Sequence, residues 1–172
     1  MLQWCKVINM KVQLTDIRIQ QDQLDSRIFR LHHTSREQTT QKRILALLVE
    51  LGELANETRC FKFWSLKGPN TQEIIAQEYS DGLHFFLSLG IDLKDDTEYL
   101  ESVCSHSDPT QQFLFIYQLV SNLLIDFTTE LYRQAFSEYL GLAQLLGMSG
   151  EDILNHYLSK NATNHQRQDE QY

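Results

Sequence analysis

The segments Glu50-Leu-Gly-Glu53 and Glu78-Tyr-Ser-Asp81 each place two acids three residues apart. On an α-helix this spacing brings both side chains to one side, so that four carboxylates from two packed helices can converge on a divalent cation. In both segments the acids border leucine and phenylalanine residues of the same helix side. An ionised acid beside a protein core is costly unless it is paired or binds a metal. The two segments therefore predict two packed helices with a metal site between them.

The plain alternative is two amphipathic helices whose acids reach water at the edge of the core. Cations that might pair with these acids are few, because the first segment offers only Arg59 and Lys62, and residues 73–90 contain neither lysine nor arginine. Oxygen ligands without cysteine favour Mg²⁺, with Mn²⁺ as a substitute, over zinc. A di-iron site requires Glu-x-x-His pairs on two helices, and only Asp81-Gly-Leu-His84 approaches that pattern.

Helical spacing of apolar residues continues through most of the 172-residue chain. Sustained alternation is missing, which leaves little room for a sheet, and residues 92–109 form an acidic connection. We predict an all-α, single-domain helical bundle. Its expected segments are helices at 15–31, 37–59, 71–90 and 149–160, with N-caps at Thr15, Thr71 and Ser149, and a long apolar helical segment at 110–146.

Composition limits the classes of function. A net charge of −8 disfavours a general nucleic-acid surface. No apolar run approaches the roughly 20 residues that span a bilayer, and the opening residues hold too short an apolar stretch for a signal peptide. Cys5, Cys60 and Cys104 lack metal-type spacing and are interpreted as free thiols in a reducing compartment. We expect a cytoplasmic protein, without a membrane or nucleic-acid partner, whose residues 1–11 are an extension.

The polar segment from Lys160 to Gln168 and the aromatic segment from Cys60 to Ser65 add groups suited to a nucleotide. Lysine and arginine donate to phosphate, asparagine can orient a sugar or base edge, and an aromatic plane can cover a base. By itself the polar segment is typical of a solvated, frayed tail, and the aromatic residues fit a core equally well. Beside a cation site, the polar segment becomes a candidate phosphate clamp.

The runs at 46–65 and 78–90 resemble the dimeric dUTPases of the all-α nucleoside triphosphate pyrophosphohydrolase superfamily, which includes MazG-like and dCTP-cleaving members. The two acidic pairs are shared across that superfamily. The dUTPase branch is indicated by Gln21 to Asp25, Phe61 to Trp64, Asp81 to Phe85 and Lys160 to Gln168. The resemblance begins near Val12. It implies a homodimer with a catalytic domain at 12–160 and a nucleotide-binding tail at 161–172.

The resemblance also implies roles for individual residues. The Mg²⁺ ligands would be Glu50, Glu53, Glu78 and Asp81, and Glu50, with Glu53 as the second candidate, would deprotonate the attacking water. The uracil and deoxyribose pocket would be lined by Gln21, Asp25, Trp64 and His84. Some members carry Asn where this chain has Asp25. The phosphates or the sugar would be met by Lys62, Lys160, Asn161, Asn164 and Arg167.

The activity implied is Mg²⁺-dependent hydrolysis of dUTP, with dUDP as a further candidate substrate. Water would attack the α-phosphate and release dUMP and pyrophosphate. One alternative is a related pyrophosphohydrolase that acts on dCTP or on many nucleotides. Another is a non-catalytic helical binding module on the same scaffold. A panel of nucleotides separates these possibilities.

Overall fold

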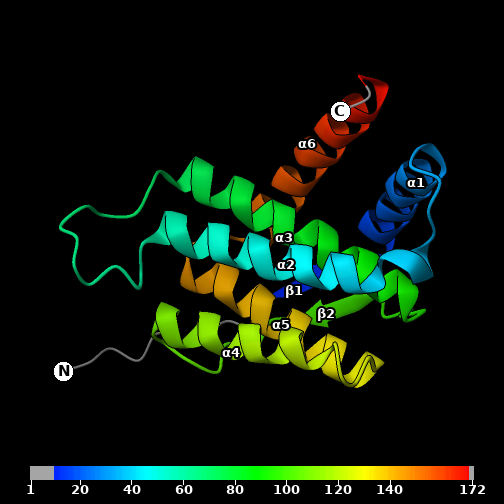
Figure 1. Ribbon diagram of the computed structural model, residues 1–172. Coiled ribbons are helices and arrows are strands. Elements are labelled where there is room, and N and C mark those ends of the chain that lie inside the picture. The colour runs from blue at the N-terminus through cyan, green and yellow to red at the C-terminus, as the bar shows by residue number, and fades with distance from the viewer. Residues whose placement is uncertain (1–9, 171–172) are drawn as a thin grey trace.

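The computed structural model describes residues 10–170 and has the predicted all-α architecture (Figure 1). The single small sheet is a pair of three-residue antiparallel strands in which Val12 lies opposite Leu100. In chain order the elements are β1 (Lys11–Gln13), α1 (Thr15–Leu31), α2 (Arg36–Thr58), α3 (Gln72–Asp92), β2 (Tyr99–Glu101), α4 (Pro109–Asn122), α5 (Thr129–Leu145) and α6 (Gly150–Asp169).

Helix α3 is the central element of the bundle. It packs along α2 and also contacts α1, α5 and α6, while α4 packs against α2 and α5 (Figure 1). Between Tyr79 and Gly90 only Asp81 and Phe85 are not buried. A helix covered on so many sides holds its few polar side chains in fixed places, because neighbouring elements limit their rotamers. The second acidic pair is therefore presented by the most enclosed helix of the protein.

Two tyrosines fix α3 against α5 directly beneath the acids. The rings of Tyr79 and Tyr139 stack with centroids 4.3 Å apart. The Tyr79 hydroxyl donates to the Tyr139 carbonyl oxygen at 3.2 Å, and the Tyr139 hydroxyl donates to the Tyr79 carbonyl oxygen at 2.6 Å. Gly82 allows this approach, because a Cβ there would lie 2.4 Å from the Tyr139 hydroxyl. Since Tyr79 follows Glu78 in the chain, this contact anchors the turn that carries the second acidic pair.

The predicted ends of α2 and α3 agree with the structure to within two residues. Thr71 caps α3 through the Ile74 amide, and Ser149 forms the expected capping box with Asp152. The expected cap at Thr15 is wrong. Leu14 occupies that position and no side chain caps the helix, because the chain enters α1 directly from β1.

Two predicted segments differ from the structure. The apolar stretch at 110–146 is two helices, α4 and α5, because a single helix of that length would extend about 55 Å and leave its apolar side uncovered. The last helix does not end near residue 160 but continues to Asp169. Arg27 of α1 forms an ion pair with Asp169 and donates to the His165 carbonyl oxygen at 3.1 Å. These contacts hold the final turns in place, so the polar segment is not a frayed tail.

Several expectations fall partly outside the described residues. Residues 1–9 of the proposed extension and Cys5 lie there, whereas Lys11 belongs to β1. Cys60 and Cys104 are free thiols, as expected. Within residues 10–170, none of the helices is both long enough and apolar enough to cross a membrane.

Candidate active site

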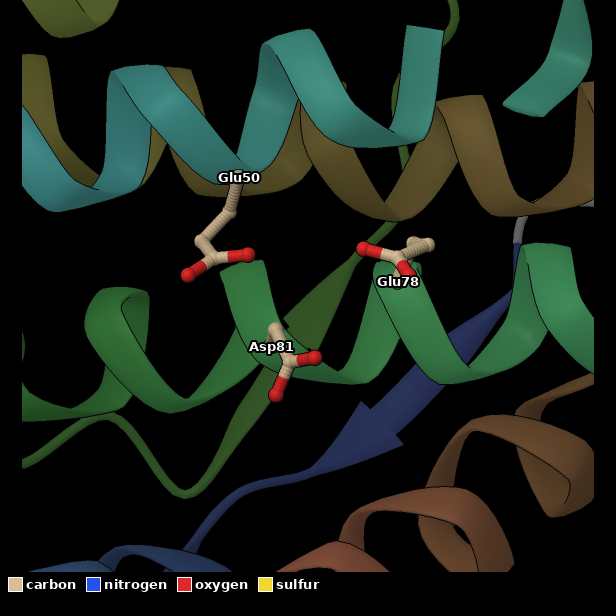
Figure 2. Close-up of side chains that lie close together, drawn as sticks. All are labelled: Glu50, Glu78 and Asp81. Atoms are coloured by element: carbon tan, nitrogen blue, oxygen red, sulfur yellow. The ribbon is translucent and has the colours of Figure 1, made fainter. Parts of the chain in front are cut away.

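Three of the four predicted metal ligands meet between α2 and α3. One carboxylate oxygen from each of Glu50, Glu78 and Asp81 lies within 4.8 Å of the others, and all three residues are half-buried. Figure 2 shows Glu50 extending from α2 toward Glu78 and Asp81 on α3. Glu53 is exposed and outside this trio, although its charge contributes to the raised pKa of both Glu50 and Glu78. The site therefore has an inner group of three acids and a fourth at its edge.

Burial and mutual repulsion raise the pKa values of these acids. Burial, followed by the charges of Asp81, Glu53 and Glu78, raises the pKa of Glu50 to about 7. The pKa of Glu78 is raised for the same reasons, with burial as the largest cause. Burial also raises the pKa of Asp81, against the opposing effect of Lys160. Crowded, partly desolvated carboxylates of this kind are suited to a divalent cation, whose charge would favour their ionised forms.

Basic residues reach the acids from α6. Lys160 Nζ donates to Asp81 Oδ2 at 2.7 Å. Arg167 is half-buried two turns further along and its charge lowers the pKa of Asp81. The structure thus places two of the predicted phosphate-binding residues beside the acidic group, because the polar segment is helical and repeats its cations on one side of α6.

A cavity of about 310 Å³ lies between α1, α2, α3 and α6. This volume is at the lower end of the range of roughly 300–1,000 Å³ for ligand pockets. Four predicted substrate-binding residues are among those that line it: Gln21, Asp25, His84 and Asn164. His84 lies one helical turn beyond Asp81 on α3, so the cavity and the acidic group are neighbours.

The polar residues of the cavity are already bonded to one another. Gln21 Nε2 donates to Asp25 Oδ1 at 2.8 Å, and Gln21 Oε1 lies 2.7 Å from His84 Nδ1. The Tyr157 hydroxyl lies 3.2 Å from the same Gln21 oxygen. Buried Asn161 donates to the Tyr157 hydroxyl at 3.3 Å, so its amide supports the pocket wall.

The other two predicted substrate residues are in the α2–α3 connection. Trp64 is 65% exposed and contacts Phe61 and Phe63 edge to face. Lys62 Nζ donates to the Asn56 side chain and lies 5.6 Å from the centre of the Phe61 ring. Neither residue lines the 310 Å³ cavity. The structure therefore does not bring Lys62 and Trp64 to the cavity that holds the other predicted base contacts.

Sequence reasoning missed the arginines that support the cavity. Arg36 donates to Asp25 at 3.0 Å, and buried Arg43 donates to the Ser88 hydroxyl at 2.8 Å. Both arginines also bond to Asp92 at the end of α3. Arg43 precedes Leu47 by one helical turn, and a cation within an apolar stripe indicates a buried acidic partner. That signal was present in the sequence.

The fold and the site together define a class: an all-α enzyme whose clustered carboxylates border a ligand cavity and face basic residues. A family model described as dUTPase matches residues 13–172. The chain belongs to this family, and it is an enzyme that hydrolyses dUTP. A comparison with curated proteins found no match.

Proposed function

We propose that the chain is a Mg²⁺-dependent dUTP diphosphatase that releases dUMP and pyrophosphate. The observation that carries this proposal is the group formed by Glu50, Glu78 and Asp81, whose ligand oxygens lie within 4.8 Å of one another. These residues, with Glu53 at the edge, would hold Mg²⁺, for which Mn²⁺ is the expected substitute. The raised pKa values fit this assignment, since crowded acids gain most from a bound cation. When bound, the metal would neutralise phosphate charge and stabilise charge that develops in the transition state.

The remaining steps belong to side chains. Glu50 would accept a proton from the water that attacks the α-phosphate, because its carboxylate extends from α2 toward Glu78 and Asp81, where the metal and the phosphates would lie (Figure 2). Glu53 is the second candidate for this role. Lys160 and Arg167 would contact the phosphates, which compete with Asp81 for these cations.

The base and deoxyribose would occupy the cavity beside His84. Gln21, His84 and Asn164 line this cavity, and one turn of α3 separates His84 from the metal-binding Asp81. Asn161 would act from the cavity wall through Tyr157. We assign the nucleotide-binding role to the last turns of α6 rather than to an unstructured tail, and keep residues 12–160 as the catalytic domain.

The decisive experiment is pyrophosphate release from dUTP, dTTP, dCTP and UTP, each with and without Mg²⁺. Within this panel, Mg²⁺-dependent cleavage confined to dUTP is the expected result. The further candidate substrate dUDP is assayed separately by release of orthophosphate, because its hydrolysis to dUMP yields no pyrophosphate. Cleavage of dCTP or of the whole panel would instead indicate a related pyrophosphohydrolase of different specificity. No cleavage of any nucleotide would favour a non-catalytic binding module and contradict the proposal.

Substitution of Trp64 tests whether its exposed ring takes part in nucleotide binding. We expect Trp64→Ala to raise the KM for dUTP about tenfold with little change in kcat, because an aromatic ring stacked on a base contributes roughly 1–3 kcal/mol. Steady-state kinetics on both proteins provides the measurement. Leu66→Ala is the matched control from the same connection, since Leu66 is fully exposed and has no assigned role. An unchanged KM for Trp64→Ala would remove this residue from the site.

We also propose that the enzyme is a homodimer in the cytoplasm. Exposed apolar side chains on α2 and α4 support the dimer, among them Leu45, Val49 and Leu114, which are 50–63% exposed. Such groups are common at interfaces between subunits. Light scattering coupled to size exclusion would test the dimer, and a monomer at micromolar concentration would contradict it.

A further inference from the structure

A chain of hydrogen bonds leads from an arginine at the start of α2 to the histidine in the cavity. Arg36 donates to Asp25 Oδ2 at 3.0 Å, and the Ser88 hydroxyl donates to the same oxygen at 2.6 Å. Gln21 Nε2 donates to Asp25 Oδ1 at 2.8 Å. Both oxygens of Asp25 are therefore engaged by donors. This arrangement makes Asp25 a poor contact for a base and a strong anchor for Gln21.

The negative charge of Asp25 determines the donor and acceptor directions in this series of hydrogen bonds. A carboxylate only accepts hydrogen bonds, so Gln21 must turn its NH₂ group toward Asp25 and its oxygen toward the other side. That oxygen lies 2.7 Å from His84 Nδ1, which must then carry a hydrogen in order to donate. The orientation of the Gln21 amide thus fixes the position of the proton on His84.

The second nitrogen of His84 is left as an acceptor. Burial, assisted by the charge of Lys160, lowers the pKa of His84 to about 3, so the ring is neutral near pH 7 and holds one hydrogen. With that hydrogen on Nδ1, Nε2 presents a lone pair. Nε2 is buried and has no hydrogen-bond partner among the described residues, although His84 lines the cavity. A buried acceptor without a partner is costly, and a ligand that donates to it would remove that cost.

We propose that Arg36 and Asp25 are positioning residues that hold His84 in the tautomer with an accepting Nε2, and that this nitrogen accepts the ring N–H of uracil. The inference rests on the proposed function, since it requires dUTP to occupy the cavity. Uracil in dUTP has one ring N–H, at N3, whereas cytosine has a lone pair at that position. Two facing acceptors would leave both unsatisfied. The hydrogen-bonded series Arg36, Asp25, Gln21 and His84, called the relay below, therefore excludes dCTP.

The variant Asp25→Asn inverts the relay without changing its shape. Arg36 and Ser88 still require an acceptor, so the introduced amide keeps its oxygen toward them and turns its NH₂ group toward Gln21. Gln21 must then rotate and present NH₂ to His84, which moves the histidine proton from Nδ1 to Nε2. We expect the ratio of kcat/KM for dUTP over that for dCTP to fall by about tenfold or more.

The tautomer itself is measured by ¹⁵N NMR of nucleotide-free protein labelled at histidine, with the His84 signals identified by their loss in His84→Gln. We expect a protonated Nδ1 in the wild-type protein and a protonated Nε2 in Asp25→Asn. The matched control is Asp22→Asn. Asp22 is exposed on the same helix and also pairs with Arg36, but its side chain forms no hydrogen bond with Gln21. This control should leave both the tautomer and the nucleotide preference unchanged.

A wild-type His84 protonated at Nε2 would overturn the relay. So would an Asp25→Asn protein whose tautomer and nucleotide preference match the wild type. If Asp25→Asn does not fold, the tautomer of His84 in the wild-type protein alone decides the relay. A wild-type enzyme inactive on dUTP would overturn the proposed function and the base contact together, while the NMR result would still decide the relay.

Discussion

Glu50→Gln is expected to lower kcat for dUTP by about 10³-fold while the helical fold is retained. The substitution removes both a candidate metal ligand and the candidate proton acceptor, and loss of a general base alone typically costs 10²–10⁴-fold. Circular dichroism and steady-state pyrophosphate release are the measurements. The matched control is Glu73→Gln, an exposed acid in the first turn of α3, which should keep wild-type activity. Full turnover by Glu50→Gln would refute its assigned role.

The same substitution should make the metal-free protein more stable at alkaline pH. The pKa of Glu50 is about 7 in the folded protein and near 4.5 when unfolded, so the folded state binds more protons between these values. Stability therefore decreases as the pH rises from about 4.5 through 7. Removing this ionisation should raise the free energy of unfolding at pH 8 by about 1 kcal/mol, after allowance for solvent screening, and have no effect at pH 4. Thermal unfolding in EDTA tests this, and equal stability at pH 8 would contradict it.

Gly141→Ala is expected to destabilise the protein by about 3 kcal/mol or more. Gly141 lies in α5 where the chain after β2 crosses it, and a Cβ there would sit 2.0 Å from the Val103 carbonyl oxygen and 2.9 Å from the Cys104 amide nitrogen. Backbone atoms cannot rotate away as a side chain can, so the helix and the connection must separate. The Val103 amide also donates to the Ser137 carbonyl oxygen at 2.9 Å, and this bond would be strained as well.

The expected decrease in Tm for Gly141→Ala is roughly 10 °C, given about 2–4 °C per kcal/mol for a protein of this size. Gly68→Ala is the matched control, because no atom lies within 4 Å of the added methyl group. Its Tm should remain within about 2 °C of the wild type. A Gly141→Ala protein that melts with the wild type would show that α5 and the β2–α4 connection can separate at little cost.

The helices were predictable where local signals act alone. The ends of α2 and α3 follow from apolar spacing and from the cap at Thr71, all of which are read within a few residues. The turn between α4 and α5 was not predictable in this way. Residues 123–128 contain neither glycine nor proline, and apolar spacing continues across them through Leu123 and Phe127. The chain turns there because α5 must bury its side against α3 and α4, which is a property of the whole fold.

The site was predictable to the extent that its residues lie on the same helices. Glu78, Asp81 and His84 are one turn apart on α3, so their common location follows from helix geometry. The separation of Trp64 from the cavity does not follow from spacing, because the α2–α3 connection leaves the bundle after Arg59, where the backbone turns left-handed. The extent of α6 depended on contacts from Arg27, which is more than 130 residues away in the chain.

Because α3 is enclosed by its neighbours, it holds its functional residues at fixed distances from one another along the helix axis. Glu78, Asp81 and His84 share one rigid rod, and at 1.5 Å per residue they stand about 4.5 and 9 Å along its axis from first to last. In the proposed arrangement, His84 contacts the base, while Glu78 and Asp81 lie beside the phosphates. The fixed spacing between these residues therefore also selects for the length of the sugar that joins base and phosphates. A one-residue insertion between Asp81 and His84 would shift the phase by about 100° and misalign recognition and chemistry in a single step.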